Sequence, residues 1–553
     1  MELDQVLYGL DPLVKACEDR VQSFQELYKD SYVRLLDQLA ILLRDESARS
    51  DELITNNLSK LVSAAEYLIS NIDLTQDFRE LSKEFIRVLA NVVADNDDNR
   101  QIVATESFIC VLGLQLENNF DDNEINERVL ILLKNLIIDN ETLEAKISKI
   151  ISENLLVYLG YEGQFMAIDL FADLITHSHF KNSVKVLQLF IRKTSLVLET
   201  AYEDEDELSE LLINLSFITE TLTMDSKLNF AGFETSLQTS LFDILTKLQP
   251  MLFPNKLKAQ RKFYSSMGNI SANLTSTNPT SLALPYIVDE SESNGYVLSS
   301  AMVILGNSIT SAELRSQLLE TCPTLISVTL SKYTFLTDPI QFQGILHLLK
   351  ALVSPLTVSE LFTESSSSLK NLDSLIEATI RNSQYYTNFT TLLIKFLQRL
   401  IVLINNKATL SKFLALKPIE LIQSSNNKDS FHIIILLLIN KIAIYTPEQI
   451  TTQEIEAVLN FNLSQIQVDH LFELTKTIGV LFKQHADVLI NQYKEKLCLV
   501  LNTVNSVGEN GGMAGKAIKN NGEYVAGMVV NYYKEKNIAA EQDELLIMAK
   551  SFF

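Results

Sequence analysis

Apolar residues recur at helical spacing along most of this chain. Leu3, Val6, Leu7 and Leu10 form one such stripe, with intervals of three or four residues that place them on one face of a helix. No alternation of the kind expected for a strand persists in the sequence. The segment from Phe431 to Ile444 is apolar nearly all round, which is typical of the inner helix of a layered structure. The pattern therefore predicts helices throughout, two of them within residues 1–50.

An asparagine returns four times after a leucine-rich stretch and a small residue or lysine. The four segments are Leu89-Ala90-Asn91-Val92, Leu133-Lys134-Asn135-Leu136, Met267-Gly268-Asn269-Ile270 and Leu305-Gly306-Asn307-Ser308. The first two asparagines are 44 residues apart and the last two 38. These intervals lie close to the ~40–47 residues of a HEAT or armadillo unit. We predict an all-α, armadillo/HEAT-like, right-handed superhelical solenoid.

The repeated asparagines are the first candidates for a partner-binding surface. Asparagine is a poor helix former, because its amide competes for backbone hydrogen bonds. Each one therefore either caps or braces a helix within the repeats, or lines a surface where it bonds to the backbone of a partner. The sequence leaves both interpretations open. The candidates are Asn91, Asn135, Asn269, Asn273 and Asn307.

The length and the turn residues determine how the chain can be organised. At 553 residues it is too long for one compact core, whereas a solenoid grows by packing each repeat on its neighbours. Its 16 glycines and 10 prolines are few for a sheet protein full of tight turns. We expect helical repeats over residues 1–505, with an acidic loop at about 199–210 and a mobile loop at about 275–295. Residues 506–553 are expected to form a flexible, glycine-rich connector and C-terminal capping helices.

The chain is acidic, with 69 Asp and Glu residues against 46 Lys and Arg and a formal net charge of −23. Such a surface repels nucleic acid and attracts basic partners, although it also serves to keep a large protein soluble. Residues 199–210 hold seven acidic side chains and no basic one. The candidates for contact with a basic partner are Glu203, Asp204, Glu205, Asp206 and Glu207. A short basic run, Lys256, Lys258, Arg261 and Lys262, is either a solvated helix face or a local positive patch.

No set of residues with catalytic or metal-binding spacing is found, so we expect neither an enzyme nor a resident cofactor. The segment from Asn510 to Ala517 is similar to a phosphate-binding loop, but it lacks the first glycine and the Ser or Thr after the lysine. His177 and His179 point to different faces of a helix, which disfavours a metal site. The four cysteines are far apart and in no CxxC spacing, which indicates small, buried apolar side chains in a reducing compartment. No signal peptide is evident and the longest apolar run has seven residues, Ile433 to Ile439. The expected location is the cytoplasm, with access to the nucleus left open and no membrane insertion.

Four segments then resemble a known family. They are Asn96-Asp97-Asp98-Asn99-Arg100, Gly268-Asn269-Ile270-Ser271-Ala272-Asn273-Leu274-Thr275, Asp338-Pro339-Ile340-Gln341-Phe342-Gln343-Gly344 and Ala549-Lys550-Ser551-Phe552-Phe553. Together they are similar to the fungal bud emergence proteins that bind Rho-type GTPases. That family is similar in turn to the small-GTPase dissociation stimulators, which are armadillo proteins. The matches extend from the first repeats to the last residue.

The resemblance implies a scaffold or chaperone for Rho-type small GTPases with basic C-terminal tails, acting in cell polarity, bud emergence and MAP-kinase signalling. A polybasic tail would be attracted to an acidic surface, mainly as a faster and salt-sensitive association. Two alternatives remain open: an atypical regulator of guanine-nucleotide exchange, and an adaptor that tethers a Rho exchange factor or a kinase without direct contact to the GTPase. The chain has no tryptophan, which disfavours the asparagine–tryptophan clamp of armadillo import receptors.

Overall fold

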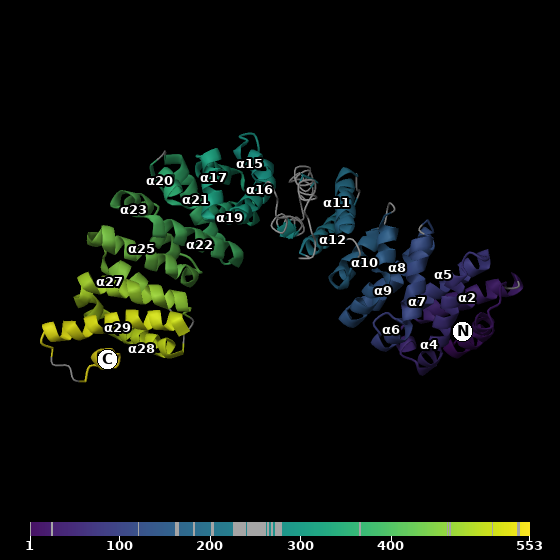
Figure 1. Cartoon of the computed structure of the whole chain (residues 1–553). Helices are drawn as coiled ribbons and strands as arrows, with labels where there is room; N and C mark the ends of the chain where they lie inside the picture. Colours follow the sequence, from purple (N-terminus) through teal and green to yellow (C-terminus); the bar gives the residue numbers. More distant parts are fainter. Residues whose placement is uncertain are drawn as a thin grey trace. The chain divides into compact units, whose positions relative to one another are not determined.

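The structure is a computed structural model that describes most of the chain (Figure 1). The residues left undescribed are 1, 24–25, 120, 161–164, 181–182, 201–203, 225–238, 241–260, 263–264, 267–268, 271–278, 364–365, 462, 464–465, 511 and 539–541. The described residues form helices and contain no strand. They divide into two compact units, Met1–Asn273 and Leu274–Phe553.

The first unit contains twelve described α-helices and one 3₁₀ turn. They are α1 (Leu3–Glu18), α2 (Glu26–Leu42), α3 (Glu46–Arg49), α4 (Glu52–Ser70), α5 (Gln76–Val92), α6 (Asp97–Val103), α7 (Glu106–Asn118), α8 (Asn123–Ile137), α9 (Glu141–Leu159), α10 (Phe165–Leu174), η1 (Ile175–His177), α11 (Ser183–Glu199) and α12 (Glu205–Thr223).

Two layers of helices run through the first unit. In one layer α2 packs on α5, α5 on α8, α8 on α10 and α10 on α12; we call these five helices the first-unit row. In the other layer α1 packs on α4, α4 on α7 and α7 on α9. Each helix thus contacts its counterpart in the next repeat, as in a solenoid, where every repeat buries the apolar face of its neighbour.

Helix α5 shows why these residues form a row helix. The Thr75 side chain accepts a hydrogen bond from the Phe78 amide and caps its first turn. Phe78, Phe85 and Leu89 are fully buried, together with six other positions of the helix. Because neighbours cover it on three sides, α5 leaves only a narrow polar stripe at the surface.

The described part of the second unit begins at Pro279, and its regular elements are also all helices. Its elements are α15 (Pro279–Val288), α16 (Gly295–Ser308), α17 (Ala312–Thr321), α18 (Leu325–Ser331), η2 (Lys332–Phe335), η3 (Pro339–Gln341), α19 (Phe342–Leu352), α20 (Pro355–Thr363), α21 (Ser366–Asn382), α22 (Thr387–Leu403), α23 (Lys407–Leu414), α24 (Pro418–Gln423), η4 (Lys428–Phe431), α25 (His432–Tyr445), η5 (Pro447–Gln449), α26 (Thr452–Leu459), α27 (Val468–Gln492), α28 (Lys494–Asn510), α29 (Gly512–Glu535) and α30 (Glu544–Lys550).

A second-unit row repeats the same arrangement, with α16, α19, α22, α25, α27 and α29 packed each on the next. Helix α25 is buried at ten of its fourteen positions, as expected from its apolar sequence. Glycines permit the close approach of α16 and α19. A Cβ on Gly344 would collide with the backbone of Ser299, and one on Gly306 would lie 2.5 Å from His347 Cδ2.

Three local expectations need correction. The expected boundary near residue 505 falls inside α28, and α29 begins at Gly512, so most of the presumed glycine-rich connector is helical. Helix packing explains this: Gly515 and Gly522 lie against α28 residues Val507 and Val504, where a larger side chain would not fit. The expected mobile loop at 275–295 contains helix α15. Cys110 is exposed rather than buried.

The acidic segment at 199–210 is partly a helix start. Asp204 caps α12 by accepting hydrogen bonds from the amides of Asp206 (2.7 Å) and Glu207 (3.2 Å). No single helix in the described part of the chain is long and apolar enough to cross a membrane; one pair, residues 339–352 and 355–362, meets the criterion only in combination and is bent by 115°. Among the described residues, no group of His, Cys, Asp and Glu is arranged to hold a metal ion.

Candidate functional site

The polar stripes of the first-unit row form one candidate surface. On α5 the stripe consists of Glu80, Lys83, Glu84, Arg87 and Asn91, whose spacing places them on one side of the helix. Neighbouring row helices contribute similar stripes. Because the rest of each helix is covered by its neighbours, this face is where polar side chains of the row are accessible to solvent or to a partner.

Two of the predicted asparagines connect consecutive row helices. The Asn91 Nδ2 on α5 donates to the Ala40 carbonyl at the end of α2 (2.7 Å). The Asn135 Nδ2 on α8 donates in the same way to the Ala90 carbonyl at the end of α5 (3.0 Å). These carbonyls belong to last turns, where helical backbone acceptors have no partner within their own helix. Asn91 and Asn135 therefore brace each repeat to the preceding one, and they stay half-buried on the polar face.

The other asparagines are placed differently. The Asn269 Nδ2 donates to the Glu220 carboxylate of α12 (2.8 Å), a side chain rather than a backbone group. Asn307 is half-buried near the end of α16, in the second unit. Asn273, like Glu203, lies outside the described residues, as do Lys256 and Lys258. The structure therefore brings Asn91 and Asn135 into one row and leaves Asn307 in another unit.

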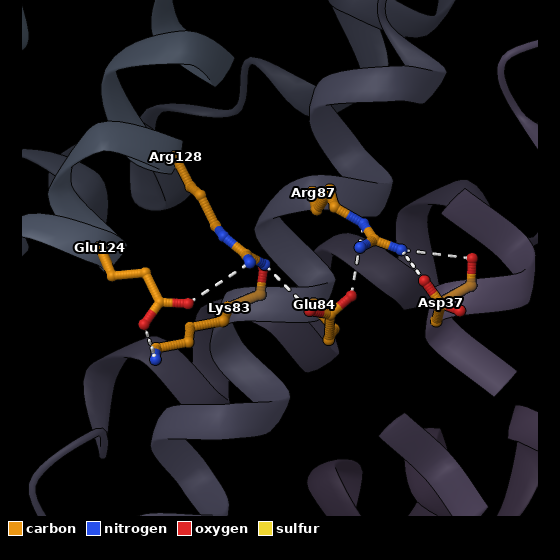
Figure 2. A network of polar contacts seen from close by, with 6 residues as sticks. All are labelled: Asp37, Lys83, Glu84, Arg87, Glu124 and Arg128. Carbon is orange, nitrogen blue, oxygen red and sulfur yellow. Dashed lines mark hydrogen bonds and ion pairs between the residues drawn. The ribbon is translucent and has the colours of Figure 1, made fainter. Parts of the chain in front are cut away.

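An ionic network links three row helices across this surface (Figure 2). Arg87 pairs with Asp37 of α2 and, through its Nε, with Glu84 at 3.3 Å. Arg128 of α8 contacts the other oxygen of Glu84 at 3.0 Å and donates to the Lys83 carbonyl at 2.9 Å. Glu84 thus bridges two arginines from successive repeats while its side chain is only 14% exposed.

The network ends in Lys83 and Glu124, which pair with one another between α5 and α8 (Figure 2). The hydrogen bond from Lys83 lowers the pKa of Glu124, with further help from the nearby Arg128 and Arg79 charges. Every cation of the network is matched by a carboxylate. This part of the surface therefore stabilises the register of the repeats and carries little excess charge.

The balance changes toward the end of the row. Lys134 of α8 contacts Asp169 at 2.8 Å and also pairs with Asp173, both on α10. Burial lowers the pKa of Lys134, but its hydrogen bonds to Asp169 and Asp173 outweigh that effect and raise it overall. Beyond Lys134, α10 and α12 contain seven carboxylates and no lysine or arginine.

The carboxylates of α12 are the exposed part of this acidic end. Asp204, Glu205, Asp206, Glu207 and Glu210 are all exposed. Asp204 is committed to capping the helix, and the first-turn position favours negative charge through the helix dipole. We call Asp169, Asp173, Glu205, Asp206, Glu207 and Glu210 the acidic end of the first-unit row.

Some residues of the interface between repeats were not singled out from the sequence. Asn99 and Arg100 lie in α6, and the sequence marks them only through the family resemblance of residues 96–100. The buried Asn99 Nδ2 donates to the carbonyls of Arg49 (2.9 Å) and Val92 (3.0 Å), and Arg100 donates to those of Val93 and Ile138. The charges of the ionic network recur at helical spacing, which is a signal that the sequence contained.

The fold and the polar rows define a class: an all-α solenoid built from helical repeats, with an extended polar face. The chain belongs to the BEM4 family, since residues 1–223 match the BEM4 N-terminal domain and residues 239–552 the BEM4 C-terminal domain. The first match lies within the first compact unit, and the second covers the end of that unit, from residue 239, and nearly all of the second unit.

Two further likenesses are informative to different degrees. The chain is 28% identical over 649 aligned positions to the GTPase-GDP dissociation stimulator BEM4 of Saccharomyces cerevisiae, with 100% of both chains covered. A solved structure from work on the phosphorylation-controlled interaction of cadherin and β-catenin covers 98% of this chain and 99% of its own, at 12% identity and a TM-score of 0.40. A likeness that weak carries no argument about fold or function.

Proposed function

We propose that the protein binds a Rho-type small GTPase and regulates it as a scaffold or chaperone in cell polarity. The single observation that carries the proposal is the full-length match to the yeast GTPase-GDP dissociation stimulator BEM4. The polar row of the first unit supports it, because a solenoid face with several helices in succession suits an extended protein partner.

The acidic end of the first-unit row is proposed to receive the basic tail of the GTPase. The neighbouring cation Lys134 is already paired with two of its carboxylates, Asp169 and Asp173. A tail of several lysines would find exposed carboxylates in Glu205, Glu207 and Glu210. Complementary charge of this kind chiefly accelerates association and makes it sensitive to salt.

Release of GDP is a second candidate function, favoured by the name of the yeast relative. Such an activity does not require a catalytic group. If the solenoid binds the nucleotide-free GTPase more tightly than the GDP-bound one, linkage requires that GDP be held more weakly in the complex by the same factor. The adaptor alternative, in which an exchange factor is tethered without contact to the GTPase, predicts no such effect.

The test is direct binding of the full chain to purified Rho-type GTPases, prenylated and with or without their basic tails, measured by titration calorimetry. We expect binding that weakens when the tail is removed. The variant Glu205→Lys/Glu207→Lys/Glu210→Lys should weaken binding of the tailed form and flatten its dependence on salt. A matched control, Glu320→Lys/Glu495→Lys/Glu535→Lys, makes the same change of charge at exposed positions of the second unit.

The results of these measurements distinguish between the proposals. Equal weakening by both triple variants would mean that net charge alone, and not the acidic end, attracts the tail. Absence of binding to every GTPase, with retained binding of an exchange factor, would favour the adaptor. Release of a fluorescent GDP analogue from the GTPase, followed with and without excess protein, tests the second candidate function.

A further inference from the structure

The negative charge of the chain is concentrated in the first unit. Residues 1–273 contain 44 acidic and 25 basic residues, a formal net charge of −19, whereas residues 274–553 contain 25 acidic and 21 basic residues, a net charge of −4. Acidic and basic residues are nearly equal in number in the second unit as a whole. On its row helices, however, the basic residues are separated from the acidic ones.

Three consecutive row helices of the second unit contain cations and no carboxylate. Helix α19 carries Lys350, α22 carries Lys395 and Arg399, and α25 carries Lys441; none of the three contains Asp or Glu. The helices pack on one another in this order. Their cations therefore follow each other across adjacent repeats, in the position that mixed charges occupy in the first unit.

Two of these cations reach back to the preceding helix. The Arg399 Nη1 donates to the Lys350 carbonyl (2.8 Å), and the Lys441 Nζ donates to the carbonyls of Val402 (2.9 Å) and Ile404 (2.6 Å). Cations suit the negative end of a helix dipole. In the first unit Asn91 and Asn135 perform the same bracing without charge, so bracing by itself does not require cations.

Neutralising partners are lacking where the second-unit cations lie. Within the described part of the chain, Lys350, Lys395, Arg399 and Lys441 form no salt bridge, whereas Lys407 nearby pairs with Glu448. Burial lowers the pKa of Lys350, and the Arg399 and Lys395 charges lower it further. Burial and then the Lys476 charge lower the pKa of Lys441. Lys350, Lys395 and Arg399 therefore lie close enough to repel one another, and Lys441 lies close enough to Lys476 for the same effect.

Exposed apolar side chains and a cavity lie next to the cations of the second-unit row. Val402 follows Arg399 by one turn and is 57% exposed, and Ile444 follows Lys441 and is 60% exposed. Beside them a cavity of about 370 Å³ is lined by Arg315, Arg399, Val402 and residues of the α16–α17 connection. Arg315 donates to the Val353 carbonyl there (2.9 Å) and adds a fifth cation.

We propose that this face, formed by Lys350, Lys395, Arg399, Val402, Lys441 and Ile444, docks an acidic peptide segment of a protein partner. Cations that lack carboxylate partners favour an anionic ligand. The two exposed aliphatic side chains favour a ligand that has apolar groups between its negative charges. Packed helices lie ~8–10 Å apart and an extended chain advances ~3.3 Å per residue, so one helix step matches about three residues.

A peptide fits this face better than a nucleic acid or an anionic membrane. Those ligands are broad polyanions, and the carboxylate excess of the chain opposes them outside a narrow strip. The proposed partner is distinct from the GTPase, whose basic tail requires charges of the opposite sign. The second unit would thereby give the scaffold a binding site independent of the first.

The probe is a fluorescein-labelled 15-residue peptide of Glu-Glu-Leu repeats, with a Lys-Lys-Leu peptide as the opposite charge, titrated with the full chain and followed by anisotropy. We expect binding of the acidic peptide only. Lys350→Gln/Lys395→Gln should weaken it about fivefold or more, whereas Lys370→Gln/Lys428→Gln, at exposed lysines off this face, should change it less than about twofold. The exposed single variant Lys395→Glu serves as well if the double variant proves unstable.

Further experiments identify the chemical class of the ligand that binds this face. Val402→Ser should weaken the acidic Leu-containing peptide about threefold and leave a Glu-Glu-Ser peptide unaffected. Equal loss in the on-face and off-face lysine variants would overturn the site. Tighter binding of single-stranded RNA, or of vesicles containing an anionic lipid, would overturn the peptide assignment. Tighter binding of a peptide copied from residues 199–210 would make this chain its own ligand and overturn the assignment to a partner. The variant Lys350→Gln/Lys395→Gln is expected to bind the GTPase as the parent chain does. Loss of GTPase binding in this variant would overturn the independence of the two sites.

Discussion

The Asn135 amide donates a 3.0 Å hydrogen bond to the Ala90 carbonyl, one repeat earlier in the first-unit row. Asn91 makes the equivalent bond to Ala40 at 2.7 Å. The repeated asparagine is therefore a brace between successive helices, whose last carbonyls would otherwise lack a protein partner. The Nδ2 group of each brace already donates to a carbonyl of the preceding helix. Any additional contact with a partner would therefore have to use the remaining atoms of the side-chain amide.

Replacing the braces should destabilise the first unit. Asn135→Ala leaves the carbonyl of the buried residue Ala90 without its donor, at a cost of about 1–2 kcal/mol in the free energy of unfolding. Asn57→Ala is the control, because Asn57 is likewise half-buried but its Nδ2 donates to the Leu53 carbonyl of its own helix rather than to another repeat. Thermal or urea unfolding measures the difference. A stable Asn135→Ala variant with weakened GTPase binding would instead make this asparagine a partner contact.

Removing the central carboxylate of the ionic network should affect stability more than removing a peripheral one. Glu84→Gln leaves Arg87 and Arg128 facing one another with only one further carboxylate each, and we expect a loss of about 2 kcal/mol. Glu127→Gln on α8, an exposed position, should change the free energy of unfolding by less than about 0.5 kcal/mol. Chemical denaturation provides both values, and equal effects would refute the bridging role of Glu84.

The close approach of α16 and α19 makes Gly344 intolerant of a side chain. Gly344→Ala places a methyl group against the Ser299 backbone and should cost about 1–3 kcal/mol. Gly527→Ala is the matched helical control, since its nearest neighbour would be 3.7 Å away and alanine has the higher helix propensity. The control should be neutral or slightly stabilising. A tolerated Gly344→Ala would show that α16 and α19 can move apart without loss.

Buried His432 should make the second unit sensitive to mild acid. Burial lowers its pKa to about 4; its ring stacks on Phe461 and its Nε2–H donates to the Val458 carbonyl (3.0 Å). The unfolded chain binds the proton at about pH 6.5, so stability is complete above that value and is lost as the pH falls toward 4. Between pH 7 and 5 the loss amounts to about 2 kcal/mol.

The comparison for this prediction is His432→Gln, which cannot take up the proton. Its unfolding midpoint should fall less between pH 7 and 5 than that of the parent chain, even if the variant is less stable at pH 7. His470, whose ring centroid lies 6.3 Å away and whose pKa burial also lowers, remains in both proteins. An identical pH dependence in the two chains would exclude His432 as a source of the effect.

The repeat architecture could be predicted because helical periodicity and the spacing of Asn91 and Asn135 are properties of the chain itself. The family segments Asn96–Arg100 and Asp338–Gly344 could also be recognised, although not the reason for them. Asn99 and Arg100 turn out to bond to carbonyls of other helices, and Gly344 to permit a helix contact. Those partners are distant in sequence, so no local pattern identifies them.

By itself the sequence determined that the chain is helical, acidic and repetitive, because hydrophobic spacing and charge are written residue by residue. Only the tertiary structure decided which charges neutralise one another. Glu84 meets Arg128 from 44 positions away, whereas Lys350, Lys395 and Arg399 gather without a carboxylate. Packing brings together side chains that belong to different repeats, and electrostatic balance depends on those distances rather than on order along the chain.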